Sequence, residues 1–401
     1  MVAVLTRVFG VHNLALAEDV VQEALCRALE VWKVGGVPDN PAAWLMTTAK
    51  NRALDVLRRE RTARTFAPEL TRVLESEHEL APRVDELFGV AAMRDDLLRM
   101  MFSCCQPRLP EEAQVALVLH ILGGFSVAEV ASAFLSGEET IKKRITRAKA
   151  VLAGSQRLFE LGDDDFAARL SSVQRALYLL FNEGYHGASP QSAVRQELCD
   201  EALRLAALLC QHALTATPTT YALAALLCLH AARLPARVDE FGDLTLLFAQ
   251  DRSLWDRELT ASGLQLMDLA TGGPELTAYH VEAAIAAVHA SAARLEDTHW
   301  TTIVGLYDTL MRIRPSPVVA LNRALAIAER DGPERGLIEL RAIVDRERMA
   351  DYPFYAAALG ELERKRGRLD VAAQHFAVAL GLARNPMERR FLERRLAMCA
   401  S

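Results

Sequence analysis

Apolar residues recur at helical spacing along almost the whole chain, and few stretches alternate polar and apolar residues as a strand would. Alanine, leucine, glutamate and arginine, which favour helices, dominate the composition. Pro- and Gly-containing segments interrupt this pattern, for example at 35–38, 107–110, 187–190, 272–274 and 315–317. The sequence therefore predicts an all-α protein with joints at these segments.

The length and hydropathy limit the class of protein. The 401 residues suffice for two or three cores, since one domain usually takes about 100–150 residues. The chain shows no apolar run of the roughly 18 residues that a membrane span needs, and no apolar signal region after a basic start. We expect a cytoplasmic protein with no membrane partner.

The cysteines give little indication of chemistry. All seven are scattered, without a C-x-x-C pair or a histidine at zinc-ligand spacing. We expect reduced, mostly buried thiols, no metal site and no cofactor. The adjacent Cys104 and Cys105 are the one alternative place for redox or metal chemistry, although neighbouring cysteines rarely reach disulfide geometry.

Charge is unevenly distributed along this chain, whose net charge is −6. Residues 50–64 hold six basic residues against two acidic ones, a net of +4, and residues 138–158 hold the same numbers. Between them, residues 67–99 hold eight acids against four arginines, a net of −4. Two basic modules joined by an acidic connector could touch a polyanion at two separate places.

A weak repeat is present near the C-terminus. The segments VALNRALAIAERDGPERGLIELRAIVD and FYAAALGELERKRGRLDVAAQHFAVAL superpose with an offset of 35 residues. The superposition pairs Ala324 with Leu359, Ile327 with Leu362, Gly332 with Gly367 and Ile343 with Val378. This period is close to the roughly 34-residue tetratricopeptide unit, so we expect tetratricopeptide-like packing; ordinary helical hairpins are the alternative.

The second basic module predicts a helix-turn-helix. In GFSVAEVASAFL, Val127, Val130, Ala131 and Phe134 share a face that begins after a Ser126 N-cap. A short turn containing Gly137 leads to a second helix, whose apolar face consists of Ile141, Ile145, Ala148 and Leu152. Its other face carries basic residues that could contact phosphates or guanine edges. An ordinary hairpin with a solvated basic face remains open.

The first basic module combines an aromatic with polar and basic residues. In PDNPAAWLMTTAKNRALDVLRRERT, the buried stripe is predicted to be Leu45, Met46, Ala49, Ala53, Val56 and Leu57. The opposite face holds Trp44, Thr48, Asn51, Asp55, Arg58 and Arg59, a set that suits unpaired bases and their phosphates. The alternative is that Trp44 packs on a neighbouring helix and Asp55 pairs with Arg58 or Arg59.

An acidic helix is predicted just upstream. LAEDVVQEALCRALEVW places Val21, Ala24, Leu25, Ala28 and Trp32 inside and Asp19, Gln22, Glu23 and Glu30 outside. An acidic face does not suit DNA, but it suits a protein partner with a basic surface. A merely solvated face is the alternative.

The order of these motifs resembles that of a bacterial extracytoplasmic-function sigma factor. AEDVVQEAL resembles region 2.2, PDNPAAWLMTTAKNRALDVLRR regions 2.3 and 2.4, and LPEEAQVALVLHILGGFSVAEVASAFLSGEETIKKRITRAK region 4. The rest, including DDLLRMMFSCCQP, ALYLLFNEGYHG and PSPVVALNRALAIAE, is similar to the group with a long tetratricopeptide-like extension. The first residues already resemble region 2.1, so the first helix of region 2 is expected to be missing.

The resemblance implies a promoter-specificity subunit without catalytic residues of its own. It implies that Asp19, Gln22 and Glu23 dock on the β′ clamp of RNA polymerase, and that region 4 meets the β flap. At the promoter −10 element it implies contacts by Trp44, Thr48, Asn51, Arg52, Arg58 and Arg59, with Asn51 placed where the family captures a flipped base. At the −35 element it implies contacts by Glu139, Thr140, Lys142, Lys143 and Arg147.

The resemblance also suggests domain boundaries. We expect region 2 at 1–66, an acidic linker at 67–99, region 4 at 100–157 and a helical extension at 160–401, with the repeats near 317–384. The extension is expected to regulate the sigma core, either by contacting regions 2 and 4 directly or by receiving a regulatory protein or a ligand. Two alternatives remain: a helix-turn-helix regulator that never joins polymerase, and an enzyme or sensor around Tyr185 and His186. In FNEGYHG these two residues and Glu183 could form a pocket, or Gly184 could end a helix.

Overall fold

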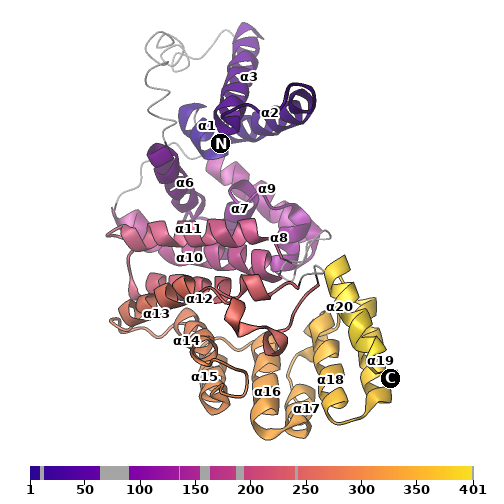
Figure 1. Ribbon diagram of the computed structural model, residues 1–401. Helices are drawn as coiled ribbons and strands as arrows, with labels where there is room; N and C mark the ends of the chain where they lie inside the picture. The colour runs from indigo at the N-terminus through magenta and orange to yellow at the C-terminus, as the bar shows by residue number, and fades with distance from the viewer. Residues whose placement is uncertain are drawn as a thin grey trace. The chain divides into compact units, whose positions relative to one another are not determined.

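The computed structural model describes residues 1–9, 13–63, 90–134, 136–153, 163–186, 194–239 and 243–399 (Figure 1). Within these ranges the chain forms helices and turns, with one isolated bridge between Val238 and Leu244 and no strand. The all-α prediction is confirmed. The described part contains no helix with the length and apolar character needed to cross a membrane.

The chain divides into two compact units, Met1–Ala176 and Leu177–Ser401. The first unit contains α1 (Val2–Phe9), α2 (Leu14–Gly35), α3 (Pro41–Ala63), α6 (Val90–Cys104), α7 (Glu111–Ile121), α8 (Val127–Ala133) and α9 (Glu138–Ala153). Helix α10 (Asp163–His186) begins in this unit and ends in the second. The expected linker at 67–99 lies mostly outside the described residues, and its last ten residues belong to α6.

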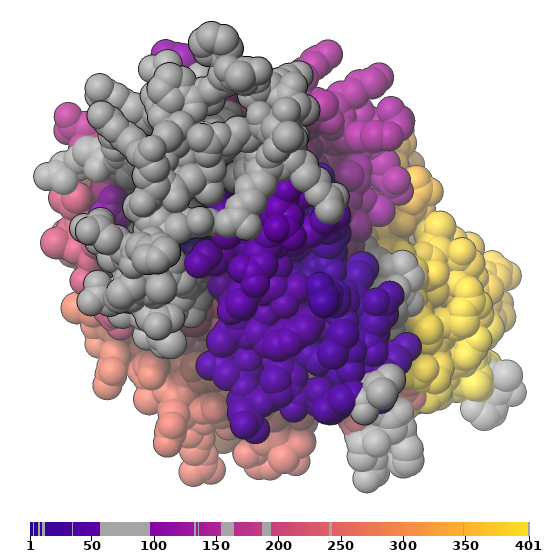
Figure 2. Space-filling model, turned by 90° about the horizontal axis from the view of Figure 1, so that it is seen from above, coloured from indigo at the N-terminus to yellow at the C-terminus, as the bar shows by residue number. Residues whose placement is uncertain are grey.

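Helices α1, α2 and α3 pack around one apolar core, and their surface is drawn in indigo in Figure 2. The core consists of Val4, Leu5, Phe9, Ala17, Val20, Val21, Ala24, Met46, Ala49 and Ala53. Helix α3 starts where the side chain of Asn40 accepts a hydrogen bond from the backbone N–H of Ala43 at 3.0 Å. The predicted apolar stripe of this helix is confirmed at Met46, Ala49 and Ala53, while the side chain of Leu57 lies outside the described residues.

Helices α7, α8 and α9 pack on one another and form the helix-turn-helix. Ser126 and Glu129 form a reciprocal cap: the Glu129 carboxylate accepts from the Ser126 N–H at 2.8 Å, and the Ser126 hydroxyl accepts from the Glu129 N–H at 3.2 Å. The predicted N-cap is confirmed. The predicted face of α9 is also confirmed, because Ile141, Ile145, Ala148 and Leu152 are all buried.

The second unit continues with α11 (Gln196–Gln211), α12 (Pro218–Ala231), α13 (Arg257–Ala270), α14 (Ala278–Ser291), α15 (Trp300–Ile313), α16 (Pro317–Asp331), α17 (Pro333–Arg341), α18 (Pro353–Lys365), α19 (Leu369–Gly381) and α20 (Pro386–Ala397). Short 3₁₀ helices lie at η2 (Leu234–Ala236), η3 (Leu247–Ala249), η4 (Arg252–Leu254) and η5 (Arg346–Met349). From α13 onward, helices adjacent in sequence pack against each other (Figure 1). A succession of short-range contacts therefore builds this unit.

The weak repeat corresponds to two helical hairpins, α16–α17 and α18–α19. Their turns contain Gly332 with φ of 97° and Gly367 with φ of 76°, which L-residues with a Cβ rarely adopt. The paired Ile343 and Val378 do not match, because Ile343 is buried and Val378 is 57% exposed. The hairpin repeat is thus confirmed up to its last helix, and the tetratricopeptide interpretation stays a prediction.

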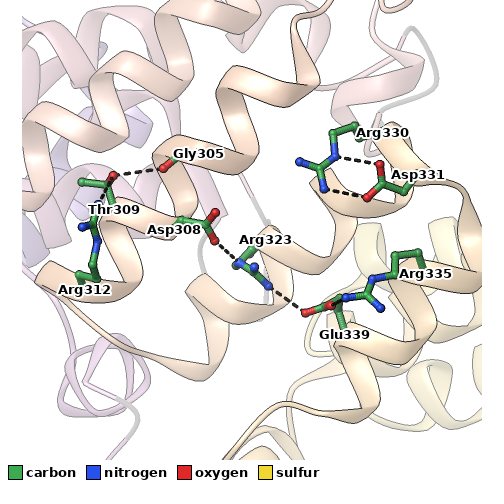
Figure 3. Close-up of polar contacts among 9 residues, drawn as sticks. All are labelled: Gly305, Asp308, Thr309, Arg312, Arg323, Arg330, Asp331, Arg335 and Glu339. Carbon is green, nitrogen blue, oxygen red and sulfur yellow. Dashed lines mark hydrogen bonds and ion pairs between the residues drawn. The ribbon is translucent and has the colours of Figure 1, made fainter.

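Ion pairs connect consecutive helices in the second unit (Figure 3). Arg323 of α16 contacts Asp308 of α15 at 2.6 Å and Glu339 of α17 at 2.8 Å. Arg335, one turn before Glu339 on α17, shares that carboxylate at 2.7 Å. One guanidinium therefore links three helices in succession.

Candidate nucleic-acid interface

The second helix of the helix-turn-helix, α9, presents a polar face to solvent. Its exposed residues include all five that were predicted to read DNA: Glu139, Thr140, Lys142, Lys143 and Arg147. Because the opposite stripe of α9 is buried, the core beneath the helix determines which face it presents to solvent. The geometry provides one surface with two lysines, one arginine and two oxygen-bearing side chains.

The basic residues of α9 differ in how they are held. Arg144 pairs with Glu112 of α7 at 2.7 Å and lies 5.9 Å from the centroid of the Phe134 ring. Lys149 pairs with Glu18 of α2 at 2.8 Å. Within the described residues, Lys142, Lys143 and Arg147 have no ion pair. These three cations are therefore free to meet phosphates or base edges.

Glu139 has a structural explanation besides a role in DNA reading. It lies with Glu138 in the first turn of α9, where the helix dipole favours negative charge. Thr140 is in the same exposed turn. A carboxylate at this place can also accept a hydrogen bond from a cytosine amino group.

The structure corrects the prediction for Trp44 of α3. This side chain is half-buried rather than exposed, and its ring meets that of Trp32 edge to face at a centroid distance of 5.5 Å. The alternative of packing on a neighbouring helix therefore holds for much of the indole. Aromatic pairs of this kind contribute about 0.5–1.5 kcal/mol beyond their buried area, which is a packing reason for Trp44.

The remaining predicted residues of α3 form a mixed group. Asn51 and Asp55 are exposed, and Thr48 is half-buried. The Arg52 guanidinium donates to the carboxylate of Glu23 on α2 in an exposed ion pair. The side chains of Arg58 and Arg59 lie outside the described residues.

The exposed face of α2 is both acidic and apolar. Asp19, Gln22, Glu23 and Glu30 are exposed as predicted, and Val21, Ala24 and Ala28 are buried. The prediction for Leu25 is wrong, because this side chain is 39% exposed, and Leu29 beyond it is 67% exposed. Gln22, Leu25 and Leu29 are spaced three and four residues apart, so they lie along one face.

Two of the three thiols of the first unit lie in its interior. Cys104 and Cys105 are buried, and burial raises the pKa of the Cys104 thiol to about 12. A thiol with so high a pKa is a poor nucleophile and metal ligand at neutral pH. Cys26 is exposed, but four of the seven cysteines are buried, as the expectation of mostly buried thiols has it. The described residues contain no group of three or more His, Cys, Asp or Glu side chains placed to hold a metal ion.

The FNEGYHG segment does not end a helix at Gly184 as predicted. Helix α10 continues to His186, and Gly184 allows the close approach of α11. A Cβ at Gly184 would lie 2.8 Å from both the carbonyl oxygen of Arg195 and the sulfur of Cys199. Glu183 and Tyr185 are buried, so this segment belongs to the interior of the second unit.

Comparison with known proteins assigns the same parts of the chain. Residues 1–63 match the family model for Sigma-70 region 2, and residues 99–152 match that for Sigma-70, region 4. Residues 169–271 match a family of unknown function (DUF6596). A curated relative, an uncharacterized protein of Rhizobium meliloti (strain 1021), is 41% identical over 388 residues, which cover 96% of this chain and 90% of the relative. No solved structure matches the chain.

Proposed function

Because this chain belongs to the sigma-70 family of RNA polymerase sigma factors, with regions 2 and 4 followed by a long helical extension, we propose that it is a sigma factor of the extracytoplasmic-function type. It binds core polymerase in the cytoplasm, recognises the −35 and −10 elements of its promoters and starts transcription there. The observation that carries this proposal is the exposed set Lys142, Lys143 and Arg147 on the second helix of the helix-turn-helix, which forms no ion pair with any other described residue.

In this proposal α9 enters the major groove at the −35 element. Lys142 and Lys143 contact phosphates or guanine, Arg147 contacts guanine, and Glu139 and Thr140 accept or donate at neighbouring base edges. The two carboxylates in the first turn repel the DNA backbone, so they favour a pose in which this turn faces bases rather than phosphates.

Region 2 acts at the −10 element and on polymerase. Asn51 and Thr48 supply polar groups for an unpaired base, while Trp44 offers the exposed part of its ring for stacking. Arg52, Arg58 and Arg59 hold the backbone. On α2, Asp19, Gln22 and Glu23 bind the β′ clamp, and Leu25 and Leu29 add apolar contact area.

The test is transcription by sigma-free core polymerase supplemented with the purified chain on a library of promoters. Start sites that share one −35 and −10 pair support the proposal. Arg147→Ala is expected to relax sequence preference at one −35 position by about tenfold, since a bidentate base contact is worth 1–3 kcal/mol. Arg312→Ala on α15 is the control, because this exposed arginine contacts only Thr309 of its own helix among the described residues.

Binding to core polymerase separates this function from a plain DNA-binding regulator. Asp19→Lys is expected to weaken binding to core polymerase while it leaves binding to −35 DNA by the helix-turn-helix unchanged. If the folded wild-type chain binds promoter DNA but not core polymerase, the regulator becomes the better interpretation.

A further inference from the structure

The second unit buries two arginine side chains in one cluster. Arg233 and Arg237 are 7% and 8% exposed, and no other arginine in the described part of the chain is buried. They flank η2, four residues apart. Within that part no ion pair joins either guanidinium to a carboxylate. Removing an arginine from water without a counter-charge costs several kcal/mol, so the cluster requires a physical explanation.

The partners of both arginines are neutral, and Tyr185 is common to them. Arg233 donates to the Tyr185 hydroxyl from Nη2 at 2.8 Å and from Nε at 3.2 Å, and Arg237 donates from Nε to the Tyr185 carbonyl at 3.3 Å. Their guanidinium carbons lie 5.7 and 4.6 Å from the Tyr185 ring centroid. These contacts orient the two cations. They supply no negative charge.

Two buried polar atoms in the same cluster have no hydrogen-bond partner among the described residues. They are Nε1 of Trp255 and Nδ1 of His289, on side chains that are 7% and 5% exposed. Arg233 lies 5.8 Å from the centroid of the Trp255 ring, and burial together with the charge on Arg233 lowers the pKa of His289. Most buried polar atoms in proteins are paired, so the indole N–H of Trp255, which can only donate, indicates a missing acceptor beside the unbalanced cations.

Arg252, which lies near this cluster, has hydrogen bonds that explain its position by a structural role alone. It donates to the carbonyl oxygens of His289 and Ala292 at 2.9 and 2.7 Å and to the Thr298 hydroxyl at 3.0 Å. It therefore satisfies the carbonyl groups at the end of α14. Arg237 also donates to a carbonyl in the last turn of a helix, that of Tyr185 in α10. No carboxylate in the described residues pairs with Arg233 or Arg237, however, so their charge is not balanced there.

The cluster reaches the surface at His186. This side chain is exposed, its ring meets the Tyr185 ring edge to face at 4.7 Å, and its Nδ1 lies 2.6 Å from Nη2 of Arg237. The His186–Arg237 contact therefore links an exposed residue to a buried cation.

From these contacts we infer that the second unit binds a small oxyanion, the phosphate or carboxylate group of a low-molecular-weight ligand, between Arg233, Arg237 and Trp255. Guanidinium groups donate in parallel pairs to two oxygens of such a group, and the indole N–H adds a third direction. The ligand supplies the negative charge that the buried cluster lacks. None of these residues takes part in the proposed contacts with DNA or polymerase, so the inference stands apart from the proposed function.

Titration of the purified full-length chain with inorganic phosphate, pyrophosphate or citrate, each compared with chloride at equal ionic strength, tests this inference. The readouts are isothermal titration calorimetry and the thermal melting midpoint. We expect saturable binding of one anion per chain and a rise in melting midpoint. Citrate as the tightest binder would indicate a carboxylate ligand, and phosphate or pyrophosphate would indicate a phosphorylated one.

Variants locate the site. Arg237→Gln removes one cation, and Trp255→Phe removes only the unpartnered N–H while it keeps the ring beside Arg233. Each is expected to weaken binding at least about tenfold, the usual effect of losing a charged or buried hydrogen-bond partner. If Arg237→Gln does not fold, as circular dichroism would show, Trp255→Phe carries the test alone.

The basic face of α9 is the competing anion site, so the double variant Lys142→Ala, Lys143→Ala is the matched control. It is expected to bind the anion as the wild type does. Absence of saturable binding by the wild type overturns the inference. So does binding that the α9 variant abolishes and that Trp255→Phe leaves intact.

Discussion

Glu23 and Arg52 were expected to serve different partners, yet they form one ion pair on the surface of the first unit. The hydrogen bond from Arg52 lowers the pKa of the Glu23 carboxyl, so the pair remains ionised at neutral pH. Asp19 lies on the same exposed face of α2 and has no ion pair in the described residues. The two acids are therefore not equivalent, because only Glu23 must give up Arg52 to bind a basic surface elsewhere.

Arg52→Ala is expected to separate the two roles. It removes one proposed −10 contact and releases Glu23, so open-complex formation should fall while binding to core polymerase stays the same or tightens. Core binding by fluorescence anisotropy and promoter opening by permanganate footprinting measure the two effects. Asp19→Asn is the matched variant, which should weaken core binding first. Loss of core binding in Arg52→Ala would show that the ion pair itself is the docking element.

His289 predicts that the second unit is sensitive to acid. Burial, then the nearby charges of Arg233 and Arg252, lower its pKa to about 3 from 6.5. Since the unfolded chain takes up this proton near the ordinary value, stability is fully present above that value and falls as the pH drops toward the folded pKa. At about pH 4.5 the loss from this group is about 2–3 kcal/mol relative to neutral pH.

His289→Gln is therefore expected to unfold with a weaker dependence on pH than the wild type. Urea unfolding at neutral pH and at about pH 4.5 gives the difference, with the exposed His299→Gln as control. His230 is another histidine whose pKa burial lowers, so part of the acid sensitivity should remain in the variant. An unchanged pH dependence in His289→Gln would show that this ring takes up its proton normally in the folded chain.

At the scale of helices, the spacing of apolar residues correctly predicted the buried face of a helix where a neighbouring helix covers its apolar stripe. Helix α9 follows this rule, since its four predicted core residues are all buried. Leu25 and Trp44 do not, because their burial depends on where the next helix ends and on the Trp32–Trp44 contact. The repeat also does not predict the environment of Val378, which is 57% exposed although its counterpart Ile343 is buried.

The arginine cluster could not have been predicted from the chain alone. Its members come from α10, the η2 turn, η4 and α14, and only folding brings them together. The spacing of Arg233 and Arg237 gave one signal, since two arginines four residues apart follow a strongly apolar helix. The spacing of residues in the sequence cannot show that both arginines lack an acidic partner among the described residues.

The ion pairs of Figure 3 make a prediction about the joints between helices. Arg323→Met removes contacts from α16 to both α15 and α17, and is expected to destabilise the second unit by about 1 kcal/mol, as for a small network of partly exposed pairs. Arg330→Met is the matched control, since the one ion pair of Arg330 in the described part of the chain is with the adjacent Asp331. Urea unfolding of the two variants should differ, and equal stability would mean that the three-helix link contributes nothing.

At the scale of the whole chain, an ion pair joins the two regions of the sigma core. Glu18 of α2 and Lys149 of α9 are 2.8 Å apart, and both side chains are partly buried. Regions 2 and 4 are proposed to act at promoter elements that lie apart along the DNA, so this pair must open when both are read. Glu18→Gln is expected to raise the affinity of the free chain for promoter DNA by a few fold, because a pair of this kind contributes about 0.5–1 kcal/mol.

Gel-shift titration without polymerase measures that affinity, and Asp19→Asn serves as the neighbouring acidic control. If Glu18→Gln and Asp19→Asn change the affinity equally, the effect comes from general charge and not from the link between α2 and α9.

Helix α10 determines where the chain can be divided. Its first part belongs to the first unit, where the Phe166 ring lies 4.7 Å from the Phe102 ring and Arg169 donates to the Phe102 carbonyl at 3.1 Å. A chain that ends at residue 162 would expose the fully buried Phe102, whereas one that ends at residue 176 would keep it covered. Loss of such aromatic packing costs about 3–5 kcal/mol.

We therefore expect the 1–176 chain to melt cooperatively and the 1–162 chain to melt lower or aggregate. Thermal unfolding followed by circular dichroism compares them, and Phe166→Ala in the full-length chain reproduces the loss without truncation. If the 1–162 chain is as stable as the longer one, α10 contributes nothing to the sigma core. If these expectations hold, a chain cut near residue 160 would lose folding as well as any regulation by the second unit. Only the chain that ends at residue 176 can then show whether the second unit controls transcription.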